Sequence, residues 1–73
     1  MINSLQNEKI KNYAKLNEKK YRDETNMFIV EGIHLVEEAK SFGIVKEILT
    51  TNPNIDGTLV SEEVMKNLLI KRV

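Results

Sequence analysis

Six basic side chains occupy the first third of this chain, and their spacing is suited to contacting phosphate. Four of them follow one another at intervals of four, four and three residues, which places them on one face of a helix: Lys11, Lys15, Lys19 and Arg22. Up to Arg22 there are six basic and two acidic residues, a charge of +4, and from Asp23 onward five and nine, a charge of −4. This division predicts a polyanion contact on one side of a neutral domain, although a solvated lysine face remains the alternative.

Other reactive chemistry has little support in the sequence. His34 is the single histidine and there is no cysteine, so neither a zinc cluster nor a cysteine-ligated metal is expected. The acidic pairs Glu37-Glu38 and Glu62-Glu63 are adjacent, so on a helix they point about 100° apart and cannot share a proton or a metal ion. No serine stands beside a base in a readable motif. We therefore predict no catalytic residue and no metal site.

Length and composition bound the size of the domain and its compartment. We expect residues 1–73 to form one small domain, and a domain of this size buries only about 60% of its unfolded surface. No apolar run is long enough to cross a membrane, and the first seven residues lack the features of a signal peptide. Together with the absence of cysteine, this predicts a cytoplasmic domain that has no membrane partner.

The first half of the chain predicts a helix followed by a buried strand. Asn7 is a suitable N-cap, and the helix after it is expected to continue to Arg22. Residues 27–31 are mostly apolar and predict a strand that is buried on both faces. The strand ends in a Glu31-Gly32 corner, where glycine supplies the conformational freedom of a tight turn.

A second helix is predicted between this corner and Gly43, which is a natural C-terminal cap. Its apolar residues recur at helical spacing and are expected to face the core: Leu35, Val36, Ala39 and Phe42. Phe28, in the preceding strand, is also expected in the core. Of the two tyrosines, Tyr21 is interpreted as a packing residue, with stacking on a nucleobase as the alternative.

The second half of the chain predicts two further strands and a last helix. Residues 44–50 and 58–60 are β-favouring and are separated by a loop that contains the turn Asp56-Gly57. Ser61 is expected to cap a helix with Glu62 and Glu63 in its first turn, an inward face, and basic residues near its end: Val64, Met65, Leu68, Leu69, Lys71 and Arg72. The fold class is therefore α/β, a small three-layer α/β/α sandwich with a short, mainly parallel sheet.

The order and spacing of these residues resemble the N-terminal RNA substrate-binding domain of the SpoU-type RNA 2′-O-ribose methyltransferases. The resemblance covers about residues 2–66 and is carried by Ser4, Asn7, Ile10-Lys11, Leu16, Lys19-Lys20, Arg22, Phe28-Ile29-Val30-Glu31-Gly32, Leu35-Val36, Glu38-Ala39, Val45-Lys46-Glu47-Ile48-Leu49 and Val60-Ser61-Glu62-Glu63-Val64-Met65. It implies a fold shared with ribosomal proteins that bind kinked RNA. Residues 68–73 depart from the family pattern, which continues with a polar turn and another apolar strand, so we expect the domain to be truncated before its last strand.

The resemblance also implies a function and its division between domains. In the family, this domain binds structured RNA (rRNA or tRNA), and a separate catalytic domain binds S-adenosylmethionine and forms a homodimer. No counterpart of the catalytic domain is expected here, so this chain is predicted to bind no cofactor and to be inactive alone. The predicted RNA contacts are Asn7, Lys9, Lys11, Lys15, Lys19, Lys20, Arg22, Glu31 and Gly32. A protein–protein interaction module and a non-functional fragment of a truncated gene are the alternatives.

Overall fold

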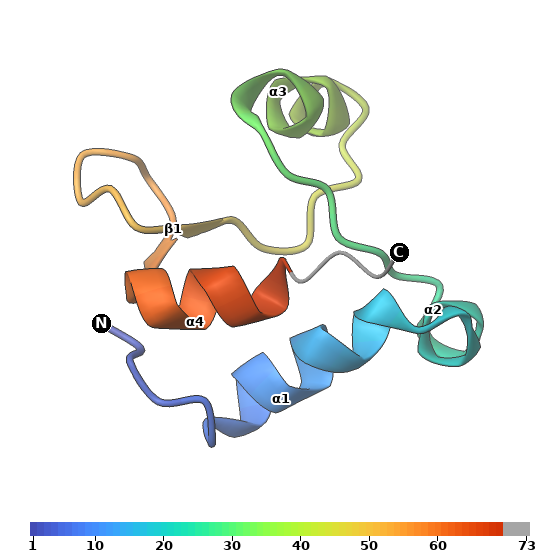
Figure 1. The fold of residues 1–73 in the computed structure, drawn as a ribbon. Helices are drawn as coiled ribbons and strands as arrows, with labels where there is room; N and C mark the ends of the chain where they lie inside the picture. Colours follow the sequence, from blue (N-terminus) through green and yellow to red (C-terminus); the bar gives the residue numbers. More distant parts are fainter. Residues whose placement is uncertain (70–73) are drawn as a thin grey trace.

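The computed structural model describes residues 1–69, and helices dominate it (Figure 1). In chain order the elements are α1 (Glu8–Ala14), the 3₁₀ turn η1 (Lys15–Asn17), α2 (Lys19–Thr25), α3 (Ile33–Ser41), β1 (Leu49–Thr50), β2 (Thr58–Leu59) and α4 (Glu62–Leu68). The expected positions of Lys71 and Arg72, and the departure from the family pattern over residues 70–73, lie outside the described residues.

The core lies where the two ends of the described chain meet. Figure 1 shows α1 and α4 running beside one another, and their facing side chains form the buried cluster: Ile10, Val60, Val64 and Leu68. Partly buried apolar residues surround this cluster: Ile2, Leu5, Tyr13, Ala14, Leu49 and Met65. Burial of these residues against each other provides the main driving force for a helical domain of this size.

The sheet is small and parallel. β1 pairs with β2 in the register Leu49 with Thr58 and Thr50 with Leu59. Ile2 extends the sheet through a parallel bridge to Val60, in which the Ile2 N–H donates to the Leu59 carbonyl at 2.9 Å. In Figure 1, α3 lies on the opposite side of β1 from α4 and α1. The chain is thus a small α/β domain with a short parallel sheet, as the sequence predicts.

Both predicted N-caps are confirmed. The Asn7 side chain accepts a hydrogen bond from the Ile10 N–H at 3.2 Å, and the Ser61 hydroxyl accepts one from the Val64 N–H, also at 3.2 Å. Each bond satisfies a backbone donor that has no partner within its own helix. Both caps stand at the N-terminal ends of the two helices that pack against each other.

The long first helix is divided, contrary to the sequence prediction. Glu18 has an extended backbone (φ −106°, ψ 134°) and separates η1 from α2. The Asn17 side chain donates to the Ala14 carbonyl at 3.2 Å and to the Leu68 carbonyl at 3.1 Å. An amide side chain that satisfies carbonyls at a helix end favours termination over continuation. The same turn brings Leu16 into a buried position.

The segment between α2 and α3, residues 27–32, also differs from its prediction. It forms an extended connector, and the structure assigns no strand to residues 27–31. Phe28, expected in the core, is 63% exposed. Residues 44–48 lie outside β1, so only the end of the predicted second strand is in the sheet, although the Ile48 carbonyl accepts a hydrogen bond from the Thr58 N–H at 2.8 Å. A strand requires a neighbour, and β propensity alone does not provide one.

α3 has the predicted bounds but not the predicted packing. Gly32 (φ 99°) precedes it and Gly43 (φ 69°) follows it, and both have the left-handed backbone that glycine tolerates. Its expected core face is only partly covered, because Val36 and Ala39 are half-buried whereas Leu35 is 51% and Phe42 71% exposed. Few residues of the sheet are available to cover this face, since each strand is two residues long.

Candidate nucleic-acid interface

The break at Glu18 rearranges the predicted basic stripe into a cluster at the junction of η1 and α2. We call this cluster the basic corner: Lys15, Lys19, Lys20 and Arg22. Lys11 is exposed on α1, one helical turn before Lys15. The corner therefore presents its cations from two helical segments that meet at an angle, instead of from one straight helix face (Figure 1).

Two lysines of the basic corner converge on one aromatic ring. The ammonium groups of Lys15 and Lys20 each lie 5.5 Å from the centroid of the Tyr21 ring. The π-electrons of a tyrosine attract cations at this distance, which holds both side chains in place. Tyr21 is half-buried, in agreement with its interpretation as a packing residue. Two like charges held around one ring create a positive potential that favours an anionic ligand.

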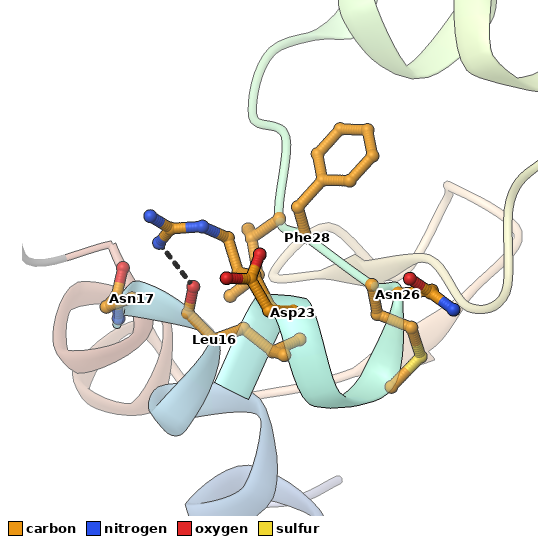
Figure 2. A pocket seen from close by; sticks show the side chains of 8 residues that line it. Leu16, Asn17, Asp23, Asn26 and Phe28 are labelled. Atoms are coloured by element: carbon orange, nitrogen blue, oxygen red, sulfur yellow. Dashed lines mark hydrogen bonds between the residues drawn. The ribbon is translucent and has the colours of Figure 1, made fainter. Parts of the chain in front are cut away.

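Lys19 and Arg22 have different roles in the basic corner. Lys19 pairs with Asp23 at 2.7 Å, and both side chains are mostly exposed. Such a surface pair contributes little, so a phosphate can take the place of the carboxylate. Arg22 is half-buried, and its Nη1 donates to the Leu16 carbonyl at 2.9 Å (Figure 2). Arg22 therefore braces the turn while its other N–H groups remain available as donors.

Two predicted contact residues are engaged in the fold. Asn7 is the N-cap of α1, and Lys9 donates to Glu47 Oε2 at 3.1 Å. Glu47 also accepts hydrogen bonds from the hydroxyls of Thr58 and Tyr13, so one carboxylate joins α1, β2 and the segment before β1. The hydrogen bond from Thr58 and then that from Tyr13 lower the pKa of Glu47. Burial and the bond to Glu47 raise the pKa of Tyr13 to about 12.

Replacing Glu47 with glutamine should make the stability of the domain less dependent on pH. Because the folded pKa of Glu47 lies below its ordinary value of 4.5, the ionised carboxylate stabilises the fold above that pH and loses this effect as the pH falls through the lowered pKa. Urea unfolding from pH 7 down to pH 3 should therefore give a flatter dependence of unfolding free energy on pH for Glu47→Gln than for the original chain. An unchanged dependence would show that the carboxylate is not held as described.

The predicted Glu31-Gly32 corner lies away from the basic corner. Both residues are exposed at the start of α3, which Figure 1 shows well separated from α1. The structure therefore brings four predicted residues together in the basic corner and places Lys11 one helical turn before it. The other four lie in the fold or at the start of α3: Asn7, Lys9, Glu31 and Gly32.

A groove of about 630 Å³ lies beside the basic corner (Figure 2). Polar and apolar side chains line it in equal number: Leu16, Asn17, Arg22, Asp23, Asn26, Met27, Phe28 and Ile29. The sequence does not predict this groove, because its walls come from η1, α2 and the connector, where a continuous helix and a buried strand are expected. Asn26, a residue type that tolerates the left-handed backbone it adopts here (φ 55°), is the one sequence signal for this turn.

Other kinds of site have no support in the same part of the chain. Residues 1–69 contain no group of three side chains that could hold a metal ion, and none of their helices is long and apolar enough to cross a membrane. Gly32 and Gly43 stand at the two ends of α3, and Gly57 packs against Ile48.

A small α/β domain with a basic corner is suited to binding an anionic ligand. The sequence model of the MRM3-like substrate binding domain matches residues 7–70, and the chain belongs to this family. The resemblance to the RNA substrate-binding domain of the SpoU-type methyltransferases is thereby confirmed.

One relative adds detail to this assignment. Over 49 residues the chain is 61% identical to the 23S rRNA (guanosine(2553)-2′-O)-methyltransferase RlmP of Bacillus subtilis (strain 168). The match covers 66% of this chain and 20% of that protein, so the aligned part spans about a fifth of the relative's length. No solved structure matches the chain significantly.

Proposed function

We propose that this chain binds rRNA on behalf of an RNA ribose 2′-O-methyltransferase and takes no part in the chemical step. The observation that carries the proposal is the 61% identity with an rRNA methyltransferase, within a match to a substrate-binding domain family. The basic corner supports it, because its cations are arranged for phosphate. The methyl transfer itself, the use of S-adenosylmethionine and homodimer formation would belong to a catalytic domain in a longer protein.

The proposed mechanism is electrostatic docking at the basic corner. Lys15 and Lys20, held around Tyr21, each contact a phosphate of the RNA. Lys19 releases its partner Asp23 and contacts a third phosphate. Arg22 maintains the turn that sets their spacing. Lys11 extends the surface along α1. Contacts of this kind recognise the shape and backbone of a folded RNA, because phosphates carry no sequence information.

The salt dependence of binding tests this mechanism. The chain should bind a transcript of the 23S rRNA segment around guanosine 2553, and its affinity should fall with salt at a log–log slope of about −2 to −3, as expected for three or four phosphate contacts. Fluorescence anisotropy between 20 and 200 mM KCl, about the range in which phosphate contacts dominate, measures this slope. A folded chain that does not bind this RNA segment, or binds it with no dependence on salt, would contradict the proposal.

A protein-interaction module is the second candidate function. It is favoured by the exposed apolar side chains on and beside α3: Ile33, Leu35, Phe42 and Ile44. Apolar surface of this kind promotes self-association in water. Sedimentation velocity over a range of protein concentrations distinguishes the two candidates. Self-association by a chain that does not bind RNA would favour the second.

A further inference from the structure

We propose that the groove beside the basic corner holds one unpaired nucleobase of the bound RNA, with Phe28 as the stacking surface. This inference rests on the proposed function and deepens it, because it assigns a place to a base as well as to phosphates. The groove's volume of about 630 Å³ lies within the range of small-molecule pockets and exceeds the needs of a single base.

Phe28 provides the first argument. Its side chain is 63% exposed, and Figure 2 shows the ring projecting from the connector, clear of α2. An aromatic ring in this position offers a flat apolar face, which is the surface on which proteins stack the unpaired bases of RNA. Met27 and Ile29 also line the groove and add apolar surface without a second ring.

The polar lining provides the second argument. Asn26 contributes a side-chain amide that can donate and accept, and among residues 1–69 that amide has no hydrogen-bond partner. Asp23 uses Oδ2 for Lys19, which leaves Oδ1 as an acceptor. Arg22 uses Nη1 for the Leu16 carbonyl and keeps its other donors. A nucleobase edge presents donors and acceptors side by side, and this lining can satisfy both.

The surrounding charge provides the third argument. Lys15 and Lys20 lie at the same junction of η1 and α2 as the groove. The phosphates on either side of an inserted base would therefore contact the ammonium groups of these lysines. A base held in the groove and phosphates held at the basic corner therefore form one continuous site. An apolar peptide would match the Phe28 wall but would have no use for the adjacent cations.

Two hairpin RNAs of identical stem, one with a single bulged adenosine and one fully paired, test the inference. The original chain should bind the bulged RNA about 10-fold more tightly, and Phe28→Leu should abolish this preference while it leaves binding of the paired RNA unchanged. Phe28→Tyr should retain the preference, because it keeps the ring. Phe42→Leu is the matched control, since Phe42 is a similarly exposed phenylalanine beside α3, away from the groove.

The outcomes separate this inference from the proposed function. Binding of both RNAs by the original chain, with equal affinity or with a preference that Phe28→Leu preserves, would overturn the base site and leave the phosphate contacts intact. Binding of neither RNA by a folded chain would overturn the proposed function and the base site together. Circular dichroism of each variant confirms that the fold is retained, which is expected because both phenylalanines are exposed.

Discussion

The Leu68→Ala variant is expected to lose about 3 kcal/mol of unfolding free energy, which is a large fraction of the stability of so small a domain. Leu68 is only 3% exposed and belongs to the cluster that joins α4 to α1. Truncation to alanine removes buried methyl groups and leaves a cavity that the two helices can close only in part. A domain of 73 residues has a total stability of about 4 to 11 kcal/mol, so the variant should keep only about 1 to 8 kcal/mol. Urea unfolding followed by circular dichroism measures the loss.

Leu35→Ala is the matched control for this prediction. It makes the same chemical change on α3, at a side chain that is 51% exposed, and should cost less than about 1 kcal/mol. The pair tests the structure against the sequence interpretation, in which both leucines face the core. Equal losses in the two variants would show that α3 packs against the sheet and would contradict the described fold.

The double variant Lys15→Glu, Lys20→Glu is expected to bind the 23S rRNA segment around guanosine 2553 about 100-fold more weakly at 50 mM salt. Both lysines lie over Tyr21, so the exchange removes two phosphate contacts and places two negative charges where the RNA backbone would approach. Repulsion therefore adds to the loss of attraction. The log–log plot of affinity against salt should become less steep, with the magnitude of its negative slope reduced by about 2.

Lys40→Glu, Lys46→Glu is the charge-matched control. Each exchange changes the charge by −2, so both double variants change the net charge from 0 to −4. Lys40 is on α3 and Lys46 precedes β1, and both lie outside the basic corner. The control should bind RNA within about 3-fold of the original chain, because distant exposed charges are screened. A similar loss in both double variants would show that total charge, and not the basic corner, determines binding.

The helix ends are the part of the fold that the sequence predicts best. The caps at Asn7 and Ser61, and the glycines on either side of α3, depend on side-chain and backbone preferences that act over three or four residues. Such preferences are encoded locally, so they are readable without knowledge of the packing. The sequence also predicts the parallel direction of the sheet, although the strands are shorter than expected.

Packing between distant segments accounts for the features that the sequence does not predict. The turn at Asn17 depends on a hydrogen bond to the carbonyl of Leu68, a residue far along the chain, and helix propensity alone gives no sign of it. The apolar residues around Phe28 favour a strand only where a neighbouring strand is present. Hydrophobic periodicity shows which residues can share a face, but the element that covers that face must be known separately.

The candidate site also has some features that the sequence predicts and others that depend on packing. The basic residues of the corner can be identified from composition and spacing, since charge is visible in the sequence. Their arrangement around Tyr21, the bracing of the turn by Arg22 and the engagement of Lys9 by Glu47 all depend on the break at Glu18 and on contacts across the fold. The groove at Asn26 follows from that same break.

The bridge between Ile2 and Val60 has a consequence for how this domain is made. The ribosome synthesises a chain from its N-terminus. Ile2 therefore emerges before its partner Val60, and α1 emerges before α4. The turns of α1 and α3 require only local hydrogen bonds, whereas the sheet and the core require both ends of the described chain. Closure of the domain therefore has to wait until α4 has been synthesised, and until then the apolar side of α1 is open to chaperones.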